Sequence, residues 1–453
     1  MKTFSIIKKS QLESAMRIDA EYYQQTFLDN IEKIKKYGCD ELQKLSIIDI
    51  TKGETPLWRG DDYLKQGVPF LRSENLISTG LDISNIVFIS EKVNKRMKRS
   101  IIYPNDILLA IVGATIGKIG LATSDYDKYN TNQAIAIVRP KNKELSNFLS
   151  IILETKFCQL QIDRLKGGGA RDNLDLHEVK VIKIPKPNTL IDYCNDIVNK
   201  IQELQKQNIF LYKQAEKILI EELELKGFNN EEKMLSIVNL SDTEYVHRID
   251  AEYFQPKYKI IEDKIKKYNA KRLGDLVSIK KGIEVGAEEY QEEGKIFIRV
   301  SSMTKFGIVE SDQKYLSEKL YEKLKKDFEP KKGEILLTKD ATPGIAYVLK
   351  HDIRGIISGG TLRLKLKDNE VEGEYLALCL NSFLGQMQAE RDAGGSVIAH
   401  WKPEQIKNVL IPILPKEIQE KISNLVKQSF EARKKSKELL EEAKRKVEEM
   451  IEK

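Results

Sequence analysis

An eight-residue phrase occurs twice in this chain of 453 residues. RIDAEYYQ at 17–24 returns as RIDAEYFQ at 248–255, and only Tyr23 is changed, to Phe254. Such a match is very improbable by chance, and a long repeat restricts the possible folds more than any single motif does. The chain is therefore interpreted as two copies of one structural unit.

Further matches extend the repeat over nearly the whole chain, at offsets between 227 and 231 residues. They include ATIG at 114–117 with ATPG at 341–344, and GGGARDNLDLHEVKVIKIP at 167–185 with GGSVIAHWKPEQIKNVLIP at 394–412. Residues 1 to about 228 and about 232 to 453 form the two copies. The segment KGFNNEE, with its glycine and asparagines, is typical of a turn between them.

Each copy is expected to divide into a globular part and a long helix. The globular parts are 1–187 and 229–415, and the helices are 188–228 and 416–453. Short apolar runs bounded by glycine turns predict strands, and one or two helices lie among them. The predicted strands are DILLAIVG, QAIAIVRP and VKVIKIP in the first copy, and GEILLTK, TLRLKLK and KNVLIPI in the second. These runs predict the α+β class.

The long helices carry apolar residues at alternating spacings of four and three, which is the pattern of a coiled-coil seam. The predicted seam contains Ile197, Ile201, Leu204, Asn208, Leu211, Ala215 and Ile218, then Leu425, Ser429, Ala432, Ser436, Leu439 and Ala443. We expect an antiparallel pair that separates two pseudo-symmetric domains, with Asn208 and Ser436 helping to fix the register. The alternative for the C-terminal helix is a loose surface helix.

The repeated phrase predicts a helix start, because Asp19 and Asp250 suit the N-cap position. After each Asp, aromatic and aliphatic residues recur on one helical face, a spacing that suits burial against a sheet. In the first copy they are Tyr23, Phe27, Ile34 and Tyr37. Packing is thus one explanation of the phrase, and contact with a partner is the other.

EKVNKRMKR at 91–99 and EKLYEKLKK at 318–326 predict amphipathic helices. Val93 and Met97 point inward in the first copy, as Leu320 and Leu324 do in the second, and lysines and arginines remain on the outer face. Such a face is often merely solvated. Solvation therefore stays the first explanation, although the return of the basic residues in both copies points toward contact with phosphate.

Catalytic and metal-binding motifs are absent from the sequence. GATIGKIG at 113–120 lacks the spacing of a phosphate loop and is expected to be a tight turn between strands. Glu178 and Lys180 form a Glu-x-Lys pair, which chance explains in a chain this rich in both residues. The four scattered cysteines indicate neither a disulfide framework nor a zinc site, so no metal is expected. Nor is there an apolar leader or a membrane span, so we expect a soluble, cytoplasmic protein.

In their order, the motifs resemble the specificity subunit of type I restriction-modification systems. They are KGETP at 52–56, VPFLRSENL at 68–76, ATIGKIG at 114–120, NQAIAIVRP at 132–140, GGGAR at 167–171 and VIKIPKP at 181–187. The resemblance covers essentially the whole chain. The second copy departs from the pattern, for example with KGIEVG at 281–286, which puts its base contacts in doubt but not its fold.

The resemblance implies two target-recognition domains that read an asymmetric, interrupted DNA sequence and have no chemistry of their own. Two methyltransferase subunits, which use S-adenosylmethionine, and restriction/translocase subunits would be the partners. We expect DNA contacts in or beside glycine turns and on the basic helices, at Lys52, Arg59, Arg72, Asn75, Arg96, Arg99, Lys118, Arg171, Lys281, Arg299, Ser302, Lys323, Lys326, Lys339 and Lys402.

Three alternatives remain open from the sequence. One is the specificity subunit of a combined cleavage-and-methylation system outside type I. Another is an enzyme with a degenerate active site, and the third is a coiled-coil interaction protein that does not bind DNA.

Overall fold

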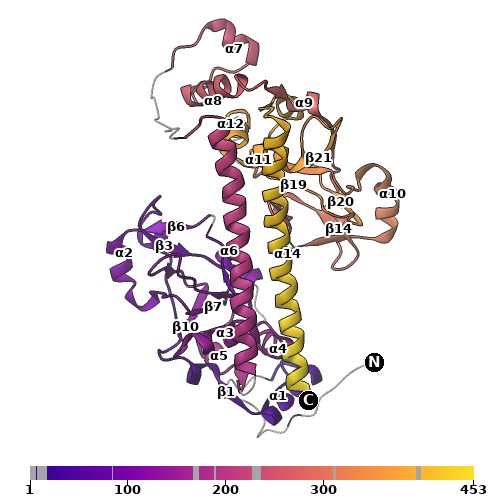
Figure 1. Ribbon diagram of the computed structural model, residues 1–453. Helices are drawn as coiled ribbons and strands as arrows, with labels where there is room; N and C mark the ends of the chain where they lie inside the picture. The colour runs from indigo at the N-terminus through magenta and orange to yellow at the C-terminus, as the bar shows by residue number, and fades with distance from the viewer. Residues whose placement is uncertain are drawn as a thin grey trace. The chain divides into compact units, whose positions relative to one another are not determined.

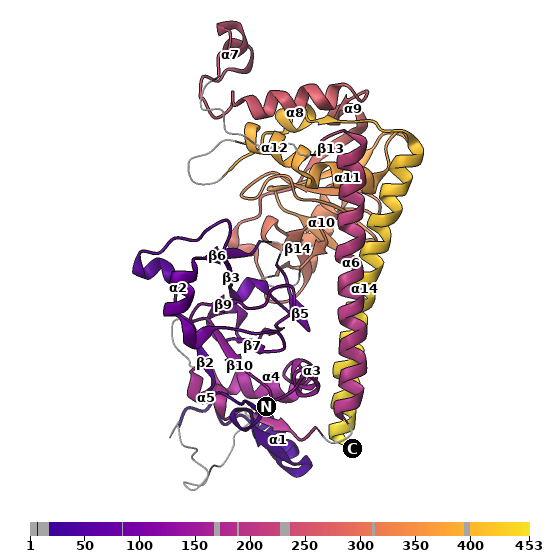
Figure 2. The same cartoon turned by 60° about the vertical axis from the view of Figure 1, so that its left-hand side comes forward.

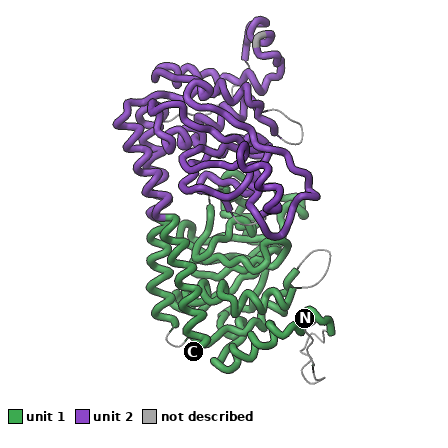
Figure 3. The backbone as a smooth tube through the Cα atoms, turned by 90° about the vertical axis from the view of Figure 1, so that its right-hand side faces the viewer, with its two compact units in different colours: residues 1–206, 433–453 green, residues 207–432 purple. Residues whose placement is uncertain are grey.

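The computed structural model describes residues 7, 18–83, 85–166, 173–187, 190–226, 236–309, 313–393 and 399–453. The chain forms two compact units, coloured separately in Figure 3. Unit 1 comprises residues 1–206 and 433–453, and unit 2 comprises 207–432. Each unit therefore contains a globular part together with half of each long helix. The predicted turn KGFNNEE lies almost entirely outside the described residues.

Unit 1 is built on small sheets whose strands come from distant parts of the copy. The four-stranded antiparallel sheet has the order β2-β10-β7-β8, with strands Thr51–Lys52, Ile135–Val138, Ile107–Ala110 and Ile119–Leu121. In the three-stranded sheet β6-β3-β9, formed by Val87–Ile89, Val68–Leu71 and Asn130–Thr131, β3 is antiparallel to β6 and parallel to β9. The remaining strand pairs are β1 (Cys39–Glu41) with β11 (Lys183–Pro185), and β4 (Leu76–Ile77) with β5 (Gly80–Leu81).

Unit 2 repeats this strand order. Its four-stranded sheet is β13-β21-β18-β19, formed by Val277–Lys281, Thr361–Leu366, Ile335–Thr338 and Ala346–Val348. Its three-stranded sheet is β17-β14-β20, formed by Lys314–Leu316, Lys295–Ile298 and Gly355–Ile357, again with one parallel pairing. The two-stranded pairs are β12 (Lys271–Arg272) with β22 (Leu410–Ile411), and β15 (Met303–Thr304) with β16 (Gly307–Ile308). The predicted internal repeat is thus confirmed.

Helices cover these sheets in both units. Unit 1 contains α1 (Gln25–Tyr37), α2 (Glu91–Arg96), α3 (Lys143–Ile152), α4 (Lys156–Leu165) and α5 (Leu176–Lys180). Unit 2 contains α7 (Leu240–Val246), α8 (Pro256–Lys266), α9 (Leu273–Leu276), α10 (Glu318–Phe328), α11 (Gly373–Asn381), α12 (Phe383–Asp392) and α13 (Pro403–Lys407). The two long helices are α6 (Leu190–Glu222) and α14 (Lys416–Glu452). The mixture confirms the α+β class.

The central strands β7 and β18 are buried on both faces, which explains their continuous apolar sequences. Along β7, Ile107 and Leu109 belong to one core, and Leu108 and Ala110 to another. Side chains alternate between the faces of a strand, so a strand covered on both sides needs an apolar residue at every position. The third predicted strand of the first copy, VKVIKIP, is correct only in part, because residues to Lys180 belong to α5 and β11 begins at Lys183.

The long helices pack against each other in antiparallel directions within each unit. In unit 1, Val198 and Ile201 of α6 share a core with Ala443 and Val447 of α14. In unit 2 the later part of α6 shares a core with the earlier part of α14, through residues such as Leu219 and Val426. Both views show α6 and α14 side by side (Figures 1 and 2). Because one face of α14 is buried in both units, it is not a loose surface helix.

The buried face of the helices is wider than the predicted seam, because each helix also covers a globular part. Eight residues of the predicted seam are buried, namely Ile201, Asn208, Leu211, Ala215, Ser429, Ala432, Ser436 and Ala443. Five predicted seam residues are only half-buried, namely Ile197, Leu204, Ile218, Leu425 and Leu439. Beside four of them the next residue is buried instead, namely Val198, Leu219, Val426 and Leu440.

The polar seam residues have partners other than each other. The Ser429 hydroxyl donates to Asn208 Oδ1 across the helix pair at 2.7 Å. The Ser436 hydroxyl donates to the Arg433 carbonyl of its own helix. Asn208 therefore links the two helices in unit 2, and Ser436 does not make the equivalent link.

The predicted N-cap role of Asp19 and Asp250 is wrong in its position. The helices begin at Gln25 and Pro256, several residues after each Asp. Asp19 accepts a hydrogen bond from the Tyr22 backbone, and Asp250 accepts one from the Tyr253 backbone. Each aspartate thus caps a turn that precedes the helix. No helix among the described residues is long and apolar enough to cross a membrane.

Candidate nucleic-acid interface

The repeated phrase is held by arginine side chains, which supports its explanation by packing. In unit 1 the Arg164 guanidinium of α4 lies 4.0 Å from the centre of the Tyr22 ring, and its Nε donates to the Tyr22 carbonyl. In unit 2 Arg391 of α12 lies 5.3 Å from the Tyr253 ring. The helices α1 and α8 that follow pack mainly on α4 and α12 and on the small strands β11 and β22.

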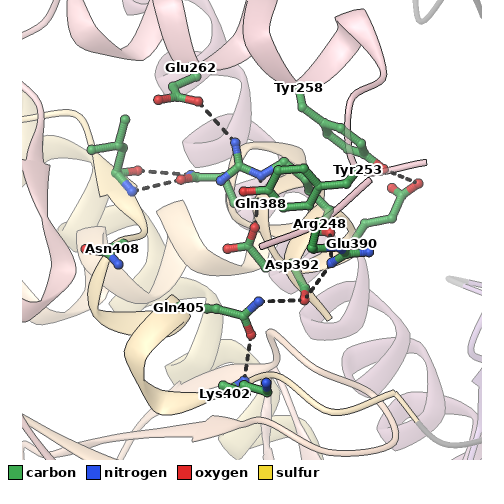
Figure 4. Close-up of polar contacts among 12 residues, drawn as sticks. Arg248, Tyr253, Tyr258, Glu262, Gln388, Glu390, Asp392, Lys402, Gln405 and Asn408 are labelled. Carbon is green, nitrogen blue, oxygen red and sulfur yellow. Dashed lines mark hydrogen bonds and ion pairs between the residues drawn. The ribbon is translucent and has the colours of Figure 1, made fainter. Parts of the chain in front are cut away.

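Arg248, the first residue of the phrase in unit 2, bonds both within the phrase and to α12, and Figure 4 shows it beside Tyr253 and Asp392. Its guanidinium forms a two-pronged ion pair with Asp250, at 2.7 and 2.8 Å, and stacks 4.7 Å from the Tyr253 ring. It also donates to the backbone carbonyls of Arg391 and Asp392. Its counterpart Arg17 lies outside the described residues.

The predicted basic helices are present. Ser90 caps α2 by accepting from the Val93 amide, and Ser317 caps α10 in the same way. Val93 and Met97 are buried. In α10 the buried residue is Tyr321, and Leu320 and Leu324 are half-buried. The exposed basic residues of these segments are Lys92, Lys95, Arg96, Lys98, Arg99, Lys319, Lys323, Lys325 and Lys326, and Glu91, Glu318 and Glu322 are exposed among them.

A buried ion pair ties each basic helix to the four-stranded sheet. In unit 1 Arg139 binds Asp106 at 2.8 and 2.7 Å and donates to the Ile101 carbonyl, just after the basic segment. In unit 2 Arg363 binds Glu334 at 2.8 and 2.9 Å and donates to the Asp327 carbonyl near the end of α10. Burial raises the pKa of Asp106, and the bonds from Arg139 only partly offset that rise.

Two predicted DNA contacts, Asn75 and Ser302, have a structural role instead. Both are buried, and each lies at the end of a short 3₁₀ helix, Ser73–Asn75 or Val300–Ser302. Asn75 Oδ1 accepts from the Arg72 amide, and its Nδ2 donates to the Asp82 carbonyl. Ser302 Oγ accepts from the Arg299 amide and donates to the Arg299 carbonyl. These bonds hold the turn that presents the arginines, so the two residues are not available to a base.

Arg72 and Arg299 follow β3 and β14 at equivalent positions, and both are half-buried. Arg72 forms an ion pair with Glu74 at 2.6 Å. Arg299 lies 6.0 Å from the centre of the Tyr290 ring. Neither arginine is therefore a freely mobile surface cation.

Arg59 and Arg96 come together in unit 1 around two acids. Glu54 pairs with Arg59 at 2.9 Å and with Arg96 at 3.3 Å, and Asp61 pairs with Arg96 at 2.7 Å. The 3₁₀ helix Pro56–Arg59 beside them presents Trp58, which is 78% exposed. Trp58 was not predicted from the sequence, although an aromatic residue within a charged glycine turn is a signal that could have identified it.

The other predicted contacts are spread over both units. Lys52 pairs with Ala136 as part of β2, and Lys281 ends β13. Lys118 is exposed, Lys402 is the exposed N-cap of α13, and Lys339 is buried. Arg171 lies outside the described residues.

The remaining sequence signals have structural explanations. Glu178 caps α5 by accepting from the Asp175 amide, and Lys180 pairs with Asp49 at 2.6 Å. The predicted tight turn is present between β7 and β8, which are antiparallel, and the last residues of GATIGKIG, Ile119 and Gly120, already belong to β8. In the part of the chain that the structure describes, no group of three or more His, Cys, Asp or Glu side chains is placed to hold a metal ion.

Comparison with known proteins assigns the chain to a family. The model of the type I restriction modification DNA specificity domain matches it twice, over residues 42–225 and 265–445. The chain belongs to this family. The specificity subunit of the type I restriction enzyme MjaIX from Methanocaldococcus jannaschii is 24% identical over 428 residues, which are 89% of this chain and 87% of that protein.

Two further relatives were found. The specificity subunit of the type I restriction enzyme EcoBI from Escherichia coli is 28% identical over 200 residues, which are 44% of this chain and 38% of that protein. The crystal structure of the type I restriction-modification S subunit from M. genitalium matches with 15% identity and a TM-score of 0.34, over 91% of this chain and 94% of that one. The protein is a DNA specificity subunit of a type I restriction-modification system.

Proposed function

We propose that this specificity subunit reads an asymmetric, interrupted DNA target in which each repeat recognises one half-site. One observation carries the proposal: the two units share one strand order but present different side chains at equivalent turns. The 3₁₀ helix Pro56–Arg59 presents Leu57, Trp58 and Arg59, whereas its counterpart Ala287–Glu289 presents an alanine and two glutamates. Different side chains on one frame would read different bases.

The exposed basic residues would hold the DNA backbone. Lysines on α2, η5 (Lys98–Ser100) and α10 project from segments that the arginine–carboxylate pairs fix to a sheet. A fixed array of cations neutralises phosphates without regard to sequence, and its contribution falls as salt rises. Residues in the turns beside the arrays would then select the bases.

The chain would act as the scaffold of a larger complex in the cytoplasm. Two methyltransferase subunits, one for each repeat, would bind S-adenosylmethionine and carry out the methylation. Restriction/translocase subunits would cut unmodified DNA. The role of this chain in the reaction would be recognition alone, without catalysis.

Exchange of one recognition domain tests the proposal. Residues 40–187 are replaced by the equivalent domain of another family member, and the preferred targets of the complex with its methyltransferase are selected from a random DNA pool. We expect one half-site to change and the other to stay. The matched control replaces residues 271–414 and should change only the other half-site. Simultaneous change of both half-sites in either exchange would refute separate reading of the two.

A further inference from the structure

The turn after β7 in unit 1 and the turn after β18 in unit 2 are closed by equivalent backbone hydrogen bonds, but the second turn is one residue shorter and carries different side chains. In unit 1 the Gly117 amide donates to the Ala110 carbonyl, and the Leu174 amide donates to the Ile111 carbonyl. In unit 2 the equivalent bonds run from Gly344 to Thr338 and from Trp401 to Lys339. These hydrogen bonds, together with the isolated bridges Val112–Asn173 and Asp340–His400, align the two turns. Lys339, Asp340 and His400 are therefore the counterparts of Ile111, Val112 and Asn173.

The three unit 2 residues form an ordered polar cluster. Asp340 Oδ2 accepts from Lys339 Nζ at 2.5 Å, and Asp340 Oδ1 lies 2.8 Å from His400 Nδ1. The Lys339 and Asp340 side chains are 11% and 19% exposed, whereas the His400 side chain is 61% exposed. The outward-facing member of the cluster is therefore the imidazole.

The backbone beneath the cluster is well fixed. Trp401, the neighbour of His400, is buried, and the Thr338 hydroxyl donates to the Thr342 carbonyl across the turn. Ala341 has a φ of 59°, a left-handed conformation that is unfavourable for alanine and is typical of positions held by their surroundings. A rigid support of this kind is what a side chain needs in order to discriminate between bases.

The charge state of Asp340 decides which ring nitrogen of His400 carries a proton. Burial raises the pKa of Asp340, but the hydrogen bonds from Lys339 and His400 outweigh it and leave the pKa below its usual value. An ionised carboxylate only accepts hydrogen bonds, so Nδ1 must carry a proton. In the neutral ring the exposed Nε2 is then an acceptor.

We propose that His400 is a specificity-determining residue of the second repeat, and that its Nε2 accepts a hydrogen bond from the exocyclic amino group of adenine or cytosine. In the major groove these amino groups are donors, whereas guanine and thymine present acceptors at the same edge. This inference rests on the proposed function. It gives Lys339 the task of orienting Asp340, in place of the direct DNA contact predicted from the sequence.

Asp340→Asn is the decisive variant, because it should reverse the selection. Lys339 can only donate, so the amide oxygen of the new side chain should face Lys339 and its NH₂ group should face His400. Nδ1 would then accept, and Nε2 would carry the proton and donate. The preferred base should change from adenine or cytosine to guanine or thymine.

The experiment selects targets from a random duplex pool at pH 8, with the full chain bound to its methyltransferase. For the wild type we expect one position in the second half-site to be restricted to adenine or cytosine on one strand. His400→Ala should lower that preference by about tenfold, the size expected for loss of one base contact. His351→Ala, at an exposed histidine of the same unit, is the control and should behave as the wild type.

The outcomes separate this inference from the proposed function. Hydrogen exchange of the β18 and β21 amides verifies that each variant is folded. With normal exchange, a His400→Ala target identical to the wild type would overturn the inference, and so would loss of the entire second half-site. An Asp340→Asn complex that keeps the wild-type base would refute the orienting role of the carboxylate. If the wild-type complex selects no interrupted target, the proposed function itself fails.

Discussion

Removal of Arg363 alone should strongly destabilise unit 2. Arg363 and Glu334 are 9% and 11% exposed, and two hydrogen bonds join them. Without the guanidinium, the Glu334 carboxylate keeps a bond from the Lys331 amide but loses its counter-charge. Breaking a buried ion pair from one side costs about 3–5 kcal/mol, because the remaining charge stays desolvated. We therefore expect Arg363→Met to cost an amount in this range.

Removal of both charges should have a much smaller effect. In the double variant Arg363→Met with Glu334→Leu, no charge is left buried and the space is filled by apolar side chains. Such replacements are often neutral or stabilising. The Asp327 carbonyl loses the bond from Arg363, but Asp327 is exposed at the end of α10, where water can replace the bond. We expect the double variant to lie within about 1 kcal/mol of the wild type.

Native-state hydrogen exchange measures both effects in the intact chain. The amides of β18 and β21, between which the pair lies, should exchange roughly 100 to several thousand times faster in Arg363→Met, since each 1.4 kcal/mol is about a factor of ten. The amides of β7 and β10 in unit 1 serve as the internal control and should not change. The matched variant Arg139→Met should accelerate exchange of the β7 and β10 amides and leave those of β18 and β21 unchanged.

Two results would refute this reasoning. An acceleration of less than about threefold in Arg363→Met would show that Glu334 is not an isolated buried charge. A double variant as fast as the single one would show that the loss comes from packing and not from charge.

Three further predictions concern other buried polar groups and the turn arginines. Burial raises the pKa of the Glu154 carboxyl from 4.5 to about 7. The contribution of this group to stability is therefore fully present below pH 4.5 and is lost as the pH rises through 7. Glu154→Gln should remove this pH dependence and stabilise unit 1 at pH 8 by about 3 kcal/mol, as measured by hydrogen exchange of α3. Asn208→Ala should lower the free energy of unfolding in urea by about 1–2 kcal/mol, because the Ser429 hydroxyl loses its partner. Asn208→Leu combined with Ser429→Ala should restore most of this free energy. Arg72→Ala with Arg299→Ala should weaken DNA binding and relax one position in each half-site, and an unchanged affinity and target in a binding titration would contradict the role of these arginines in DNA contact.

The architecture could be predicted well from the sequence, because each strand and helix is encoded twice, by two different stretches of the chain. The strands at the centre of each sheet have apolar runs in both copies, so β7 and β18 could each be recognised from the other. The long helices were equally clear, since their apolar spacing continues over many turns. Elements whose apolar pattern occurs in both copies can therefore be predicted from the sequence.

The candidate site was harder to predict, because polar side chains gain their roles from neighbours distant in sequence. Asn75 was expected to contact DNA, but its amide bonds the backbone of its own turn. Arg139 and Arg363 were not singled out, although each anchors a basic helix, Arg139 from just after β10 and Arg363 from within β21. Nothing in the spacing of Arg363 and Glu334 along the chain indicates that they meet.

A comparison of the two anchors shows what the repeat has kept. Asp106 and Glu334 occupy the same place, one residue before β7 or β18. Their arginines do not correspond: Arg139 follows β10, whereas Arg363 lies within β21. Both nevertheless form a two-pronged pair and bond a carbonyl close to the basic helix. The link between helix and sheet was thus retained while the residue that makes it moved. Because the side chains in the neighbouring turns differ freely, we infer that the frame determines how the turns are held, and that the turn residues determine which bases they meet.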